Sequence, residues 1–180
     1  MKKVFLVLVA SVFAICANAQ FYVGGTFGYL SEDNGSDITH IKILPELGYK
    51  MTDAVSFGAT LGYTKNWSKI IPSNNYNQTS EEGYTVQPYL RYKIASSGKF
   101  SLSGELDLSY TKFTHVGYEA AAFVRPVLSF DLTNHFSLVS KFGFLGYDKY
   151  SPDAENASET TLWGVNLDGN SLEFGAIYNF

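Results

Sequence analysis

Apolar and polar residues alternate with a period of two along almost the whole chain after residue 19. This period is typical of β-strands with one face in an apolar environment and the other face in a polar one. No segment after residue 19 shows an amphipathic helical pattern of useful length. The alternation predicts eight strands, at 20–30, 38–50, 54–65, 84–94, 100–111, 118–131, 135–148 and 170–180.

The predicted strands are long, and the segments between them differ in length. Each strand has about the 9–11 residues that a tilted strand needs to cross a bilayer, or more, whereas strands of soluble proteins have about 5–6. The connections at 51–53, 95–99 and 132–134 are short, and those at 66–83 and 149–169 are long. Short turns at one end and long loops at the other are typical of outer-membrane barrels. We therefore predict an all-β fold, an eight-stranded antiparallel up-and-down transmembrane β-barrel with both termini in the periplasm.

The apolar face of these strands could point inward, as in a soluble lipocalin-like barrel, or outward to lipid. Seven glycines fall on the polar face: Gly24, Gly28, Gly48, Gly58, Gly62, Gly143 and Gly175. Glycine has no use on a solvated surface, but it makes room for long side chains inside a narrow barrel. The chain also ends in "SLEFGAIYNF", with apolar residues at every second position back from Phe180. Both features favour an outward apolar face. The content of 13 Tyr, 14 Phe and 16 Gly fits rings that meet a membrane interface.

The polar face carries charges of both signs in nearly equal number. They are Lys42, Glu46, Arg91, Glu105, Asp107, Glu119, Arg125, Lys141 and Glu173. Eight strands enclose a lumen that side chains just fill, and an unpaired charge there costs several kcal/mol or more. We predict a salt-bridged plug, and the alternative is a narrow channel for ions or small solutes.

Three strands share the order Pro, any residue, Leu, any residue, aromatic, charged. These stretches are "LPELGYK", "QPYLRYK" and "RPVLSFD", with Pro45, Pro88 and Pro126. Proline cannot donate to a strand ladder. By face assignment all three prolines point to lipid, so we predict a weakened or bulged ladder at one common height around the barrel.

Residues 1–19 have the pattern of a signal peptide. Lys2 and Lys3 precede the apolar run 4–15, and Ala-Asn-Ala at 17–19 predicts cleavage before Gln20. Residues 20–180 would then form one barrel domain. Cleavage would remove Cys16, the single cysteine, so no disulfide is expected. Without Lys2 and Lys3 the 13 basic residues become 11 against 17 acidic ones, a net charge of −6 that disfavours nucleic acid as a partner.

The signal peptide, the eight strands, "LPELGYKMTDAVSFGATLGYTK", "QPYLRYK" and the terminal aromatic together resemble the outer-membrane β-barrel domain family. The likeness is to eight-stranded barrels of the OmpA/OmpX type, especially the small Bacteroidetes-like versions. It implies an assembly signal for the barrel-insertion machinery at Leu172, Phe174, Tyr178 and Phe180. It also implies a cell outer-membrane location in contact with lipid and lipopolysaccharide. The exposed loops would make surface or host contacts, and the protein would be a monomer.

The histidines are the obvious candidates for enzymatic chemistry. "NHFSL" places His135 two residues before Ser137, which loosely resembles the His-x-Ser of outer-membrane lipid A deacylases but lacks the Asn expected next. His40 and His115 have no recognisable Ser–His–acid arrangement around them. We predict a protein that is not an enzyme and needs no cofactor or metal. The less favoured alternative is a lipid A-modifying enzyme.

Overall fold

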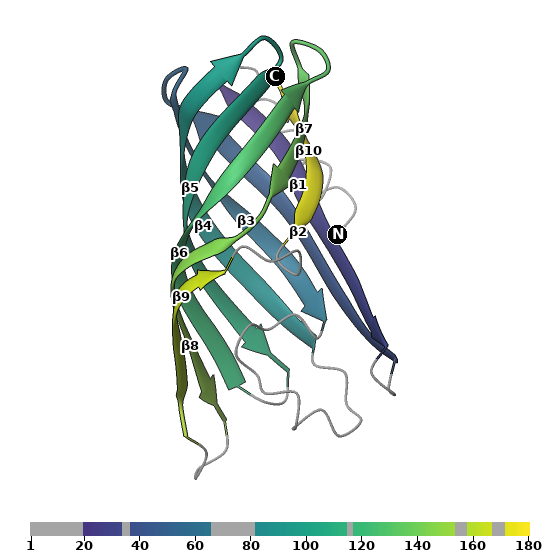
Figure 1. Ribbon diagram of the computed structural model, residues 1–180, viewed down its shortest axis with the longest axis vertical. Helices are drawn as coiled ribbons and strands as arrows, with labels where there is room; N and C mark the ends of the chain where they lie inside the picture. The colour runs from purple at the N-terminus through teal and green to yellow at the C-terminus, as the bar shows by residue number, and fades with distance from the viewer. Residues whose placement is uncertain (1–19, 34–36, 66–81, 115–116, 154–157, 167–171) are drawn as a thin grey trace, which may run out of the picture.

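The computed structural model describes residues 20–33, 37–65, 82–114, 117–153, 158–166 and 172–180 (Figure 1). Among these residues, no helix is long and apolar enough to cross a membrane. The strands are β1 (Phe21–Asp33), β2 (Asp37–Lys50), β3 (Val55–Lys65), β4 (Glu82–Ser97), β5 (Phe100–Phe113), β6 (Gly117–Asp131), β7 (Phe136–Lys141), β8 (Phe144–Pro152), β9 (Thr160–Asn166) and β10 (Glu173–Asn179).

The strands form one antiparallel sheet that closes on itself. Its order is β5-β4-β3-β2-β1-β10-β7-β6-β8-β9, and β5 also pairs with β6. Both β7 and β8 pair with β6, so they are two parts of one barrel strand. In the same way β9 pairs with β8 and β10 pairs with β7. The ten strands therefore make the eight positions of a closed barrel, which confirms the predicted fold class (Figure 1).

The prediction of one unbroken strand at 135–148 is wrong. Val127 of β6 pairs with Lys141, but Val124 pairs with Leu145, so one extra residue lies between β7 and β8. Gly143 adopts a φ of 77°, a left-handed conformation that glycine tolerates. The extra residue reverses the faces beyond it. Phe144 has the same parity as the outward-facing Phe136 and Leu138, but it is only 2% exposed and points inward.

The loop predicted at 149–169 is also wrong in large part. The β8 strand continues to Pro152, and β9 pairs with it as a hairpin from Phe144↔Asn166 to Tyr150↔Thr160. The pattern of β9 concealed it, because Leu162 and Trp163 are neighbours of opposite parity and both are exposed. The first hairpin is likewise longer than expected, with β1 reaching Asp33 and β2 starting at Asp37.

The outer surface of the barrel is apolar on every strand. Its exposed large side chains include Phe27, Tyr29, Ile43, Leu47, Phe57, Leu61, Val86, Leu90, Leu106, Leu108, Val124, Leu128, Phe136, Leu138, Leu145, Tyr147, Trp163, Val165, Phe174 and Tyr178. Aromatic pairs border this surface at both ends. Near the short turns they are Phe21–Tyr49 and Phe100–Phe130, with ring centroids 4.9 and 4.6 Å apart; near the other end they are Tyr63–Tyr84 and Tyr110–Tyr118, at 6.0 and 5.7 Å.

The three repeated prolines coincide with interruptions of the sheet. Pro45 and Pro88 are exposed and Pro126 is half-buried. On one side each stays in register, with β1, β3 and β5 respectively. On the other side, β2 and β3 are unpaired at 44–45, β4 and β5 are unpaired at 87–88, and β6 meets the break between β7 and β8. On the interrupted side, the neighbouring strand would have accepted a hydrogen bond from the backbone N–H that proline lacks.

Two of the short turns are built in the same way. The hydroxyl oxygen of Thr52 accepts hydrogen bonds from the N–H groups of Ala54 and Val55, at 3.2 and 3.0 Å. Thr133 accepts from His135 and Phe136 at 3.2 and 3.0 Å. A threonine that caps the backbone in this way stabilises a tight turn. These turns form part of the rim of the barrel at its short-turn end.

Candidate functional site

The centre of the barrel holds one carboxylate surrounded by three cations. Glu105 of β5 is fully buried. Its side-chain oxygens lie 2.6 Å from Arg91, 3.1 Å from Arg125 and 3.1 Å from Lys141. Because β4, β6 and β7 supply these cations, Glu105 joins strands from different parts of the barrel wall.

The remaining predicted interior charges continue from this centre. Glu46 contacts Lys141 at 2.8 Å and Arg91 at 3.4 Å. Glu173 contacts Arg125 and Lys42 at 3.1 and 3.0 Å.

The last of these carboxylates, Asp107, lies 3.1 Å from the Nε of Arg125 and accepts a 2.6 Å hydrogen bond from the Gln87 amide. The structure thus connects eight of the charged residues singled out from the sequence in a single network of four acids and four bases. Its charges cancel, which a buried set requires.

An aromatic layer packs against the network at Arg91. The hydroxyl oxygens of Tyr22 and Tyr89 are 2.8 Å apart, and the Arg91 guanidinium lies over both rings, 5.9 and 5.0 Å from their centroids. Val139 and Ile177 complete this cluster. The alternation of apolar and polar residues does not predict this layer, because it marks the inward face only as polar.

Cross-strand glycines are the signal that could have revealed this layer. Gly48 pairs with Tyr22, and Gly58 pairs with Tyr89. A Cβ on Gly48 would lie 2.1 Å from the Tyr22 ring, and one on Gly58 would lie 2.5 Å from the Tyr89 hydroxyl. Each tyrosine therefore occupies the space that its partner glycine leaves open.

Towards the other end the lumen is filled as well. Phe113, Phe123 and Phe144 are buried, and Phe123 and Phe144 pack with ring centroids 5.3 Å apart. A cavity of about 20 Å³ remains beside Thr64 and Gln87, enough for about one water molecule. Glu119, the other predicted interior acid, also lines this cavity.

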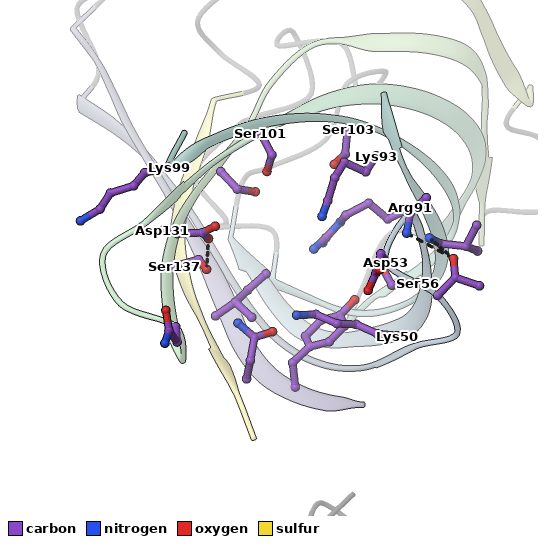
Figure 2. A pocket seen from close by; sticks show the side chains of 18 of the residues that line it. Lys50, Asp53, Ser56, Arg91, Lys93, Lys99, Ser101, Ser103, Asp131 and Ser137 are labelled. Atoms are coloured by element: carbon purple, nitrogen blue, oxygen red, sulfur yellow. Dashed lines mark hydrogen bonds between the residues drawn. The ribbon is translucent and has the colours of Figure 1, made fainter. Parts of the chain in front are cut away.

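A larger cavity of about 560 Å³ opens at the short-turn end, and we call it the vestibule (Figure 2). Tyr22, Arg91 and Ile177 line it next to the aromatic layer. Its other lining residues are mainly polar: Lys50, Thr52, Asp53, Ser56, Lys93, Lys99, Ser101, Ser103, Ser129, Asp131, Thr133, Asn134, Ser137 and Asn179. The vestibule is thus a polar chamber adjoining the Tyr22–Tyr89 layer.

The candidate histidine chemistry is not assembled around His135. Its Nδ1 is 2.9 Å from the carbonyl oxygen of Asn179, and its ring stacks on Tyr178. Ser137 donates instead to Asp131, at 2.6 Å. His115 and the side chain of His40 lie outside the described part of the chain.

The residues of the expected assembly signal lie in β10 or directly beside it, with Leu172 just before the strand and Phe180 just after it. Phe174 and Tyr178 point outward and are 60% and 44% exposed. Phe180 packs against Tyr178 with ring centroids 5.2 Å apart, and its N–H donates to the carbonyl oxygen of Phe21. Leu172 is half-buried. Their role in assembly stays a prediction.

The described residues define a closed eight-stranded antiparallel barrel that is apolar outside and charged inside. Among solved structures it is similar to Neisserial surface protein A (NspA), with a TM-score of 0.54, 16% sequence identity, and coverage of 89% of this chain and 97% of that one. This similarity supports the fold class. A major outer membrane protein from Thermus thermophilus matches with a TM-score of 0.43 and 15% identity, over 89% of this chain and 99% of that one. No family model matches the sequence, and no curated protein does.

Proposed function

We propose that the chain is a small integral protein of the Gram-negative outer membrane, with a plugged barrel and surface loops that make contacts outside the cell. The observation that carries this proposal is the distribution of side chains, with apolar residues outside and charged residues inside. A soluble barrel would have the opposite distribution. The similarity to NspA, whose name describes a surface protein, supports the same location.

The orientation follows from the lengths of the connections. In outer-membrane barrels the short turns lie in the periplasm and the longer loops outside. The vestibule and the ends of the described chain would then lie on the periplasmic side, and the β8–β9 hairpin on the outer side. Export would depend on the signal peptide expected at 1–19, and insertion on the terminal aromatic residues. We place the protein in the OmpA/OmpX type and expect it to act as a monomer.

The β8–β9 hairpin offers candidate residues for contacts on the extracellular side. Trp163 of β9 is 81% exposed. Lys149 and Glu159 form an ion pair at 2.7 Å across the hairpin, and Lys112 and Asp153 form another at 2.7 Å beside it. Backbone pairing of β8 with β9 holds the hairpin, and these exposed ion pairs add little to its stability. The hairpin can therefore present one surface to lipopolysaccharide or to a partner protein.

A plugged barrel has two consequences that can be measured together. Detergent-folded protein should migrate faster on a gel than the boiled sample, and it should give no stable single-channel steps in a planar bilayer in which a porin gives them. If boiled and unboiled samples run alike and the protein stays soluble without detergent, the membrane proposal fails. If folded protein produces discrete steps, the plug fails and the channel alternative takes its place.

A further inference from the structure

The vestibule has the size of a ligand site. Its volume of about 560 Å³ falls within the roughly 300–1,000 Å³ of small-molecule pockets. At its inner end the vestibule meets Tyr22 and Arg91, and Arg91 is already paired with Glu105 and Glu46 in the charge network. A molecule that enters from the short-turn end therefore meets the rim and wall residues of the vestibule.

Two lysines reach into the vestibule without a counter-ion. Figure 2 shows Lys50 and Lys93 pointing towards its centre, whereas Lys99 extends away from it. Within the described part of the chain, neither Lys50 nor Lys93 has an acidic group within 4.0 Å. The charges of Lys93, Asp131 and Asp53 act on Lys50 across the vestibule. Two ammonium groups that repel each other across a polar chamber favour an anion between them.

Serine hydroxyls complete a set of donors on the same wall. Ser56 of β3 pairs with Lys50 on one side and with Arg91 on the other, and Ser103 of β5 pairs with Lys93. Strands β2 to β5 thus present two ammonium groups and two hydroxyls from adjacent positions. Ammonium and hydroxyl donors together suit the several acceptor oxygens of a phosphate group.

Acceptors lie on the other side of the vestibule. Asp131 and Ser137 are joined there by their 2.6 Å hydrogen bond, and Ser101 and Ser129 pair nearby (Figure 2). A carboxylate repels a second anion but accepts hydrogen bonds from hydroxyl groups. Asp53, at the rim beside Lys50, acts in the same way. The ligand should therefore combine an anionic group with a hydroxylated part.

We propose that the vestibule binds a phosphate group that carries a hydroxylated substituent, with the phosphate on Lys50 and Lys93 and the hydroxyls towards Asp131. Glycerol phosphate has this chemistry, either free or as the headgroup of an anionic phospholipid. The proposal rests on the proposed function only in placing the mouth of the vestibule in the periplasm.

The test uses the full barrel folded in an uncharged detergent, with its lysines dimethylated with ¹³C, a modification that keeps their charge. Lys→Arg variants assign the NMR signals. Glycerol 3-phosphate should shift the signals of Lys50 and Lys93 saturably and leave that of Lys112, at the other end of the barrel, unchanged. Equal, unsaturable shifts at all lysines would show ionic screening only and would overturn the proposal.

The lipid arm uses short-chain phosphatidylglycerol as the probe. Saturable shifts with this lipid and none with glycerol 3-phosphate would identify a membrane headgroup as the ligand, and the reverse would identify a free metabolite. No shift with either probe would overturn the site.

Variants then test which side chains bind the phosphate and which bind the hydroxyl groups. Lys93→Gln should lower the affinity for glycerol 3-phosphate, measured from the shift of the Lys50 signal, by about tenfold. That is the contribution of one charge-assisted hydrogen bond. The matched control Lys112→Gln, at the other end of the barrel in an ion pair with Asp153, should change nothing. Asp131→Asn should weaken the binding of glycerol 3-phosphate but not that of inorganic phosphate. An equal loss of affinity for both would refute the role of Asp131. Gel migration shows whether each variant is folded, and the wild-type titration decides the case if one is not.

The proposed orientation of the barrel in the membrane can be tested independently of ligand binding. Ser97→Cys places a thiol at the β4–β5 turn, beside the vestibule. An impermeant thiol reagent should label it only after the outer membrane of the host cell is permeabilised. Labelling of intact cells would overturn the proposed orientation and leave the binding result standing.

Discussion

Replacement of Glu105 by Gln tests whether the interior network stabilises the barrel. The substitution keeps the volume of the side chain and removes its charge. Glu105 contacts Arg91, Arg125 and Lys141 at 2.6–3.1 Å, so three ion pairs are lost together. The network then holds four cations and three acids.

The expected loss of stability depends on which acidic partners the three cations keep. Arg91 and Lys141 keep Glu46, and Arg125 keeps Asp107 and Glu173, so no cation loses its last partner. Removal of one partner of a buried ion pair costs about 3–5 kcal/mol. We expect the lower end of that range, about 3 kcal/mol, because every cation keeps an acid. With a urea slope of about 1–3 kcal/mol per molar, the unfolding midpoint should fall by about 1–3 M.

The assay is urea unfolding of the barrel in lipid vesicles, followed by gel migration and fluorescence. Lys112→Gln is the control, because its ion pair with Asp153 is about half exposed and should contribute less than about 1 kcal/mol. The double variant Glu105→Gln with Lys141→Met restores the balance of charge and should lose less stability than the sum of the single variants. If Glu105→Gln is as stable as Lys112→Gln, the network does not stabilise the fold and the reasoning is refuted.

Three further predictions concern the glycines, the outer hairpin and catalysis. Gly48→Leu should reduce the folded fraction on the gel, because even a Cβ would lie 2.1 Å from Tyr22; Gly104→Ala, with its nearest neighbour at 3.5 Å, should fold normally. Hydrogen bonds from Lys149 and Ser151 lower the pKa of Glu159, so this contact should support the hairpin above the ordinary carboxyl pKa and be lost as the pH falls through the lowered value. Hydrogen exchange of β8 and β9 should accelerate over that acidic range, and Glu159→Gln should abolish the dependence. Lipid A from cells with and without the protein should have the same mass, and loss of an acyl chain would establish an enzyme.

Most strand positions and faces could be predicted from the sequence, because a barrel strand that faces lipid on one side and the lumen on the other alternates apolar and polar residues. The two errors in strand layout have local causes. One extra residue at Gly143 reverses the faces of β8, and a single inserted position leaves no clear periodic signal. In β9, Leu162 and Trp163 are both exposed, so the alternation that reveals the other strands is absent there.

The composition of the interior network could be predicted, but its pairing could not. Glu105 contacts Lys141 across the lumen, from strands that are not neighbours in the sheet. Such contacts depend on the tilt and stagger of the strands, which alternation does not encode. The vestibule was missed for a related reason, since its lining comes from turns and strand ends on most of the barrel.

The seam between β1 and β10 has a consequence for the order of folding. It joins the two ends of the described barrel through only six residue pairs, from Tyr22↔Asn179 to Phe27↔Phe174. Closing a loop costs more entropy as the loop lengthens, and no other ladder among the described strands closes a longer one. The hairpins can therefore form first and the seam last. Gly25 and Gly175 lie so close there that a Cβ on Gly175 would lie 1.9 Å from the Gly25 oxygen, so a side chain at the seam should slow this final step more than one elsewhere. Refolding followed by pulsed hydrogen exchange should protect the amides of β10 after those of β4 and β5.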